Sequence, residues 1–141
     1  MTYAATLIIV DRGAGGDVRV LMGQRRPDVA FMPGKFVFPG GRVAAGDKQI
    51  PIADELRPAE TAKLLHDMKG GGSAGRARAI ALAAVRETFE EAGLLIGTRA
   101  EKIEAPDAPP TWKAFLDEGY LPRLSGLTCF ARAITPPGRA R

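Results

Sequence analysis

The chain has 141 residues, 45% hydrophobic and 26% charged, which is typical of one globular domain with its own core. No apolar run approaches the roughly 18 residues that span a bilayer, and the amino terminus lacks the basic start of a signal peptide, so we expect a cytoplasmic protein without membrane contacts. The formal net charge of +4 suits anionic ligands, but only residues 138–141 cluster basic side chains, so no nucleic-acid partner is expected.

The first forty residues predict short strands joined by turns. Ala4 to Val10 and Val18 to Gln24 are mostly apolar, and the glycine-rich turn 13–17 between them predicts an antiparallel hairpin. Another short strand is expected at residues 36–38, where Pro39-Gly40-Gly41 ends it.

The middle of the chain predicts two helices. Pro58 to Lys69 has a proline in its first turn and ends at the triple glycine 70–72. A longer helix is expected from Ser73, which can cap its start, to about Ala92. Gly93 can adopt the left-handed conformation that ends a helix there.

The last third predicts a strand from Leu94, a helix over Thr111 to Glu118 and a strand over Leu127 to Ile134. The single cysteine, Cys129, excludes an internal disulfide and is expected to be a buried residue of the last strand. His66, the only histidine, is expected to be a surface or packing residue. This order of strands and helices argues for a layered α/β (α+β) domain.

Three glutamates share one face of the predicted helix 73–92. At 100° per residue, Glu87, Glu90 and Glu91 fall within about 100° of one another, opposite an apolar stripe. Their repulsion costs some tenths of a kcal/mol per pair, roughly, and Arg86 can offset part of it by reaching Glu90. A hard divalent cation would also relieve it, although the spacing alone is more typical of a solvated acidic face.

Two segments resemble the halves of a known motif. Residues 86–94, Arg-Glu-Thr-Phe-Glu-Glu-Ala-Gly-Leu, resemble the second half of the Nudix box, with Thr88 where the family prefers an aliphatic residue. Residues 38–47 resemble the first half, a Gly-Gly loop followed by an acid, with Asp47 in place of the usual glutamate. The connection between the halves is much longer than in the family, so we place an insertion at about residues 48–78 and expect it to loop out.

The resemblance implies a Nudix-type fold, a mixed sheet sandwiched between helices, in a single domain over residues 1–141. It implies a hydrolase that cleaves a diphosphate bond with Mg²⁺ or Mn²⁺. The metal ligands would be the Gly40 carbonyl and the carboxylates of Glu87, Glu90 and Glu91. Glu87 would also orient and deprotonate the attacking water, and Arg86 would hold the carboxylates by ion pairing.

The motifs also point to a substrate class. Residues 21–26, the Gly-Gly loop, the insertion inside the box and the segment 134–138 are similar to the coenzyme A diphosphatases of the family, including peroxisomal ones. Coenzyme A or acyl-coenzyme A is therefore the leading substrate, with substrate-binding candidates Arg25, Arg26 and Arg42. ADP-ribose, NADH-like dinucleotides and nucleoside triphosphates are the other substrates that the motifs allow.

Other function classes stay open at this point. One is a Nudix-like protein that binds nucleotide or ADP-ribose as a sensor without catalysis, and another is an RNA-associated or cap-processing protein. Because family members carry further strands, a second major helix and often a fourth acidic ligand, the resemblance also implies a fold truncated at the C-terminus. A homodimer is one way in which such a chain could be completed.

Overall fold

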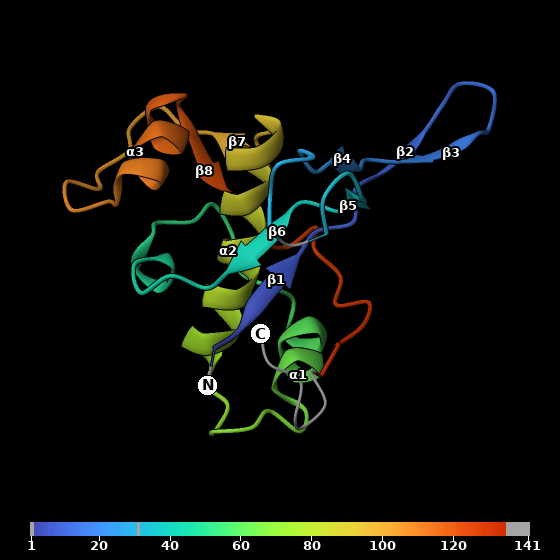
Figure 1. The fold of residues 1–141 in the computed structure, drawn as a ribbon. Coiled ribbons are helices and arrows are strands. Elements are labelled where there is room, and N and C mark those ends of the chain that lie inside the picture. Colours follow the sequence, from blue (N-terminus) through green and yellow to red (C-terminus); the bar gives the residue numbers. More distant parts are fainter. Residues whose placement is uncertain (1, 31, 135–141) are drawn as a thin grey trace.

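Residues 2–30 and 32–134 are described by a computed structural model of the protein (Figure 1). In chain order their elements are β1 (Ala4–Thr6), β2 (Val10–Arg12), β3 (Val18–Val20), β4 (Gly23–Gln24), β5 (Phe36–Val37), β6 (Gly40–Arg42), the 3-10 helix η1 (Asp47–Gln49), α1 (Pro58–Leu65), α2 (Ala74–Ala92), β7 (Gly97–Arg99), α3 (Pro110–Asp117) and β8 (Tyr120–Pro122). Within these residues no helix is long and apolar enough to cross a membrane. The basic cluster 138–141, and all of the segment 134–138 after its first residue, lie outside the described residues.

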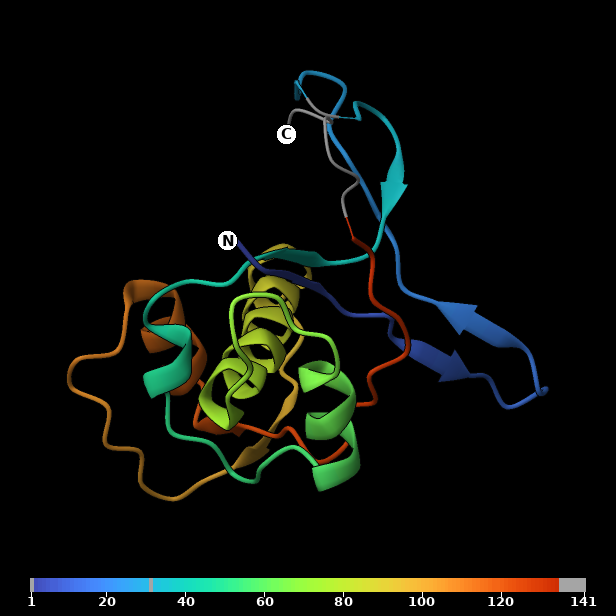
Figure 2. The same cartoon turned by 90° about the horizontal axis from the view of Figure 1, so that it is seen from below.

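The strands of the described residues pair in antiparallel ladders: β1 with β6, β2 with β3, β4 with β5, and β7 with β8. The predicted hairpin is confirmed, since Val10 faces Val20 and the N–H of Gly13 closes the turn on the Asp17 carbonyl at 2.9 Å. This β2–β3 hairpin extends away from the rest of the molecule (Figures 1 and 2). The predicted strand 4–10 is divided because its first part pairs with β6 and its end pairs with β3.

Helix α2 is the centre of the structure, in contact with β1, β6, η1, α1 and α3 (Figure 2). Its predicted ends are confirmed: the Ser73 hydroxyl accepts a hydrogen bond from the N–H of Arg76 at 3.2 Å, and Gly93 is left-handed with φ of 67°. Small side chains let the neighbours approach α2 closely on several sides, through the buried residues Ala77, Ala79, Ala81, Ala83 and Ala84. The helix that carries the glutamates is therefore held from several directions.

The inserted segment contributes to the core. Ile50 and Leu56 are buried in the same apolar cluster as Leu82 and Val85 of α2, and α1 also contacts α2. The expectation that the insertion loops out is therefore wrong for these parts. Fully burying an isoleucine or leucine side chain is worth roughly 1.5–3 kcal/mol, which favours their return to the domain.

The predicted strand Leu127 to Ile134 is wrong, because no strand is formed by any of these residues. The segment docks on α1 through side chains: Arg57 donates to the Leu127 carbonyl at 3.1 Å, and Arg132 donates to the Leu64 carbonyl at 2.8 Å. Cys129 is half-buried rather than buried, and its backbone N–H donates to Glu60 at 2.7 Å. Apolar alternation predicted a strand, but these backbone groups are satisfied by charged side chains instead.

Other boundaries differ by a few residues. The strand expected from Leu94 begins at Gly97, since it forms only where β8 lies opposite, and β8 itself was not predicted. Helix α1 ends at Leu65 rather than Lys69, because Asp67 has a positive φ of 49°. The helix at Thr111 to Glu118 is confirmed within one residue at each end as α3. His66 is exposed, as expected.

Glu60 should make stability depend on pH. Hydrogen bonds from Lys63 and from the Cys129 N–H lower the pKa of this carboxyl, although burial opposes them. A lowered folded-state pKa adds stability above the unfolded pKa of about 4.3, and the gain is lost as pH falls through the folded value. The free energy of unfolding, measured with urea between about pH 7 and pH 3, should therefore depend less on pH in Glu60→Gln than in the wild type. An equal change of this free energy with pH in both proteins would refute the role of Glu60. Glu101→Gln, at an exposed position, is the control.

Candidate active site

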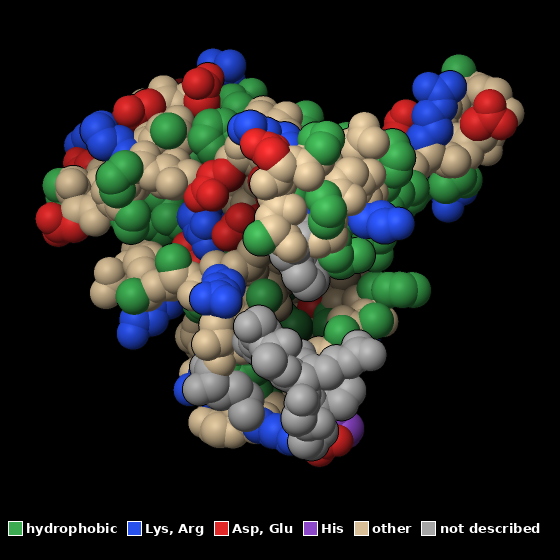
Figure 3. Space-filling view, viewed as in Figure 1, with side chains coloured by type: hydrophobic (Ala, Val, Ile, Leu, Met, Phe, Trp, Pro, Cys, Tyr) green, Lys and Arg blue, Asp and Glu red, His purple; other side chains and the backbone are tan. Residues whose placement is uncertain are grey.

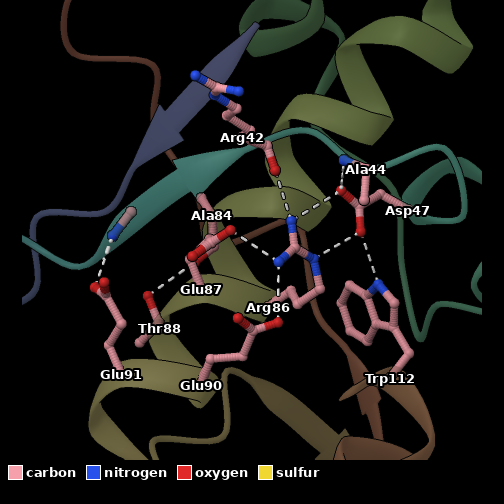
Figure 4. A network of polar contacts seen from close by, with 11 residues as sticks. Arg42, Ala44, Asp47, Ala84, Arg86, Glu87, Thr88, Glu90, Glu91 and Trp112 are labelled. Atoms are coloured by element: carbon pink, nitrogen blue, oxygen red, sulfur yellow. Dashed lines mark hydrogen bonds and ion pairs between the residues drawn. The ribbon is translucent and has the colours of Figure 1, made fainter. Parts of the chain in front are cut away.

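The two motif halves lie side by side in the structure. Strand β6 packs on α2, so the Gly-Gly segment lies over the C-terminal half of the helix (Figure 4). Acidic side chains gather on this face of the molecule (Figure 3). The backbone N–H of Gly40 donates to the Glu91 carboxylate at 3.1 Å, which joins the halves directly. The expectation that the Gly-Gly loop meets the carboxylate face is thus met despite the insertion.

Asp47 and Arg86 form a buried ion pair, 39 positions apart in sequence. Arg86 Nε donates to Asp47 Oδ1 at 2.9 Å, and the aspartate side chain is 0% exposed. Burial by itself lowers the pKa of Arg86, but hydrogen bonds to Asp47 and Glu90 outweigh it and raise the pKa above its ordinary value. Arg86 is therefore positively charged at any pH at which the protein is folded.

Arg86 connects the whole site through its other nitrogens. Nη1 donates to Glu87 at 2.8 Å and to Glu90 at 2.9 Å, which confirms the predicted pair with Glu90. Nη2 donates to the backbone carbonyl of Arg42 at 2.7 Å. One guanidinium thus links η1, β6 and two of the three glutamates, a use of the planar fork that lysine could not reproduce.

The three glutamates differ in burial and partners. Glu87 is the most buried of them, and burial raises its pKa, as do the charges of Glu90 and Glu91, while Arg86 opposes the rise. Glu90 is about one-third exposed, with 33% of its side chain accessible, and Glu91 is exposed. In the contacts above each glutamate uses one carboxylate oxygen.

The donor chemistry of this face fits a hard divalent cation. Glu87, Glu90 and Glu91 supply only carboxylate oxygens, the ligands that Mg²⁺ and Mn²⁺ prefer. Across residues 2–30 and 32–134, however, no three acidic, histidine or cysteine side chains converge closely enough to hold an ion as they stand. Ligation would therefore require the three carboxylates to move closer together, and each has a second oxygen outside the contacts above with Arg86 and the Gly40 N–H.

The outer edge of β6 supplies backbone groups to the site. Leu7 donates to the Pro39 carbonyl and Val43 donates to the Tyr3 carbonyl, so odd-numbered residues of this stretch bond to β1. In an antiparallel ladder the alternate residues then direct their N–H and carbonyl groups away from the partner strand. The Gly40 N–H and the Arg42 carbonyl follow this rule, since they meet Glu91 and Arg86. The Gly40 carbonyl lies on the same edge.

Gly40 and Gly41 both lie in close approach to neighbouring atoms. A Cβ at Gly40 would overlap the backbone of β1, and one at Gly41 would overlap the Glu87 carboxylate. The Gly-Gly pair thus lets β6 lie against the glutamate. Thr88, which departs from the motif, is fully buried and satisfies its hydroxyl by donating to the Ala84 carbonyl at 2.8 Å.

Gly41→Ala is expected to lower the free energy of unfolding by about 1–3 kcal/mol, the usual effect of adding a methyl group where there is no room. Gly15→Ala is the matched control, because a Cβ there meets nothing within 4 Å. Urea unfolding of the two variants compares them directly. Equal stabilities would show that the Glu87 side chain moves aside without strain.

The structure places the three predicted substrate arginines in different surroundings. Arg26 pairs with Asp28 on the exposed loop after β4. The backbone N–H of Arg25 bonds to the Lys35 carbonyl beside the β4–β5 ladder. Arg42 contributes its carbonyl, while its exposed side chain points away from the carboxylates (Figure 4).

One contact of the candidate site was not predicted. Trp112 of α3 donates from its indole Nε1 to Asp47 Oδ1 at 2.8 Å. The two residues are 65 positions apart, and nothing in the local pattern of α3 distinguishes this tryptophan from an ordinary core residue. Only the tertiary structure shows that it contacts the site.

Comparison with known proteins supports the fold. No protein-family model matches this chain. Among solved structures, it is similar to a Nudix hydrolase from Alicyclobacillus acidocaldarius, with a TM-score of 0.64 and 27% sequence identity. The match covers 96% of this chain but only 63% of that protein, so the chain spans less than two thirds of its relative. The chain therefore has the α/β fold of a Nudix hydrolase, as expected from the motif.

Proposed function

We propose that this chain is a Nudix-type hydrolase that cleaves the diphosphate of a nucleoside diphosphate-linked small molecule with Mg²⁺ or Mn²⁺. The observation that carries the proposal is the convergence of Asp47, Glu87 and Glu90 on one guanidinium beneath the Gly-Gly strand. The likeness to a structure described as a Nudix hydrolase supports the same reaction class.

In this proposal Glu87, Glu90 and Glu91, with the Gly40 carbonyl, hold the cation. The bound ion would neutralise diphosphate charge and lower the pKa of water. The protein residues would hold the carboxylates in place: Arg86 Nη1 bonds to both Glu87 and Glu90, and the Gly40 N–H bonds to Glu91. Glu87, held under Gly41, would orient the attacking water and accept its proton.

Coenzyme A or acyl-coenzyme A is the substrate that we propose first. The support is the resemblance of residues 21–26 and of the split box to coenzyme A diphosphatases, together with the net charge of +4. Arg25, Arg26 and Arg42 are the proposed phosphate contacts. Because Arg26 pairs with Asp28 and the Arg42 side chain points away from the carboxylates, these two would meet parts of the substrate remote from the diphosphate that is cleaved.

A substrate panel tests the proposal. Coenzyme A, ADP-ribose and NADH are each incubated with the protein and Mg²⁺, and the release of monophosphate products is measured. We expect turnover of at least one compound, fastest with coenzyme A. Tight binding without turnover of any of them would contradict hydrolysis and favour a sensor of nucleotides or ADP-ribose. Faster turnover of ADP-ribose or NADH would keep the reaction class and replace the substrate.

A further inference from the structure

Trp112 meets the proposed site through Asp47, to which its indole N–H donates. It is the only tryptophan of the chain and is 1% exposed. Its indole N–H bonds to the same Asp47 oxygen that receives Arg86 Nε (Figure 4). The tryptophan thus touches the residue that holds Arg86, and Arg86 in turn holds Glu87 and Glu90.

The carboxylate of Asp47 has a complete set of donors. Oδ1 accepts from Arg86 and Trp112 at 2.9 and 2.8 Å. Oδ2 accepts from the Ala44 N–H at 2.7 Å and from Arg86 Nη2 at 3.3 Å. A buried carboxylate with donors on both oxygens is held in one orientation. Without the indole N–H, the Arg86 guanidinium would be the remaining one of these two donors to Oδ1.

The indole ring is itself firmly placed. It packs edge-on against Phe115, with ring centroids 5.4 Å apart, and Phe115 packs edge-on against Phe89 at 5.3 Å. Phe89 belongs to α2, between Glu87 and Glu90 in sequence. The tryptophan is therefore tied to the glutamate helix twice, by its N–H through Asp47 and by its ring through Phe115.

We propose that Trp112 is a positioning residue for the glutamate site: its N–H holds Asp47 so that Arg86 aims at Glu87 and Glu90. The inference rests on the proposed function for its effect on catalysis. The restraint of Arg86 by Trp112 and Asp47 does not depend on that function. Partners behind the direct ligands of a metal site commonly change metal affinity or activity by about 10–100-fold.

The test compares two replacements that remove the N–H. Trp112→Phe keeps an aromatic ring, and growth with benzothienylalanine replaces the indole N–H by sulfur with little change of shape. Because the chain has one tryptophan, the analogue alters only this position. Leu116→Val, at another buried position of α3, is the control for general destabilisation. Should Trp112→Phe fail to fold, the analogue alone decides.

Three readouts separate positioning from packing. We expect solvent exchange of the Arg86 Nε–H, followed by NMR, to be faster than in the wild type in both replacements and unchanged in Leu116→Val. The dissociation constant for Mg²⁺ alone should rise and kcat should fall by about tenfold, with KM unchanged. Unchanged exchange and Mg²⁺ affinity in the analogue, or equal losses in Leu116→Val, would overturn the role of Trp112. If the wild type neither binds Mg²⁺ nor turns over substrate, the proposed function fails, and the exchange rates still decide whether Trp112 positions Arg86.

Discussion

Replacing Arg86 with leucine is expected to lower the free energy of unfolding by about 3–5 kcal/mol, the effect of breaking a buried ion pair by removing one partner. Asp47 would keep its buried position and lose the cation that bonds to both of its oxygens. The Trp112 and Ala44 N–H groups would still solvate the aspartate, but neither carries a charge. Urea unfolding of the variant and the wild type at neutral pH measures the difference.

An exposed ion pair provides the control for Arg86→Leu. Arg78 pairs with Glu55 at 2.8 Å, and the side chains are 38% exposed for Arg78 and 50% exposed for Glu55. Because such surface pairs contribute about 0–1 kcal/mol, Arg78→Leu should leave stability nearly unchanged. Similar losses in the two variants would mean that leucine at either position acts through something other than the burial of an unpaired charge.

Glu90→Gln is expected to reduce hydrolysis by at least about 100-fold, the upper part of the range seen even for partners behind a metal's direct ligands. The amide keeps the size of the side chain and an oxygen that can still accept from Arg86 Nη1. Because Glu90 is partly exposed, stability should change by less than about 1 kcal/mol. Steady-state kinetics with Mg²⁺, alongside urea unfolding, separates the loss of activity from a loss of folding.

Glu104→Gln is the matched control for this activity loss. Glu104 is an exposed carboxylate between β7 and α3 that pairs with Lys102 and has 72% of its side chain in solvent. Its replacement makes the same change of charge and should leave kcat unchanged. Wild-type rates in Glu90→Gln would remove Glu90 from the set of ligands.

Helices were easier to predict than strands in this chain, because their signals are local. Ser73 and Gly93 cap α2 through hydrogen bonds and backbone angles that depend on adjacent residues alone. The segment Leu127 to Ile134 has the alternation of a strand, yet a strand needs a partner backbone. Its backbone bonds to the side chains of Arg57 and Glu60 instead, and its own Arg132 side chain donates to the Leu64 carbonyl. No local pattern encodes that outcome.

The same distinction holds for the candidate site. Helical spacing places Glu87, Glu90 and Glu91 on one face, and it also predicts the contact of Arg86 with Glu90. The meeting of the Gly-Gly segment with Glu91 was expected only through the resemblance to the Nudix box. The bond from Trp112 to Asp47 and the bond from Arg86 to the Arg42 carbonyl depend on how η1, β6 and α3 pack around α2, which spacing along the chain does not specify.

The dependence of hydrolysis on metal tests the central claim most directly. Release of monophosphate from coenzyme A and ADP-ribose is measured with the wild type, first with Mg²⁺ and then with excess chelator. The glutamate site predicts turnover with Mg²⁺, none with chelator, and recovery when Mg²⁺ is restored. Equal rates with and without chelator, or no turnover alongside no binding of Mg²⁺, would contradict the assignment of Glu87, Glu90 and Glu91 as a metal-dependent catalytic site.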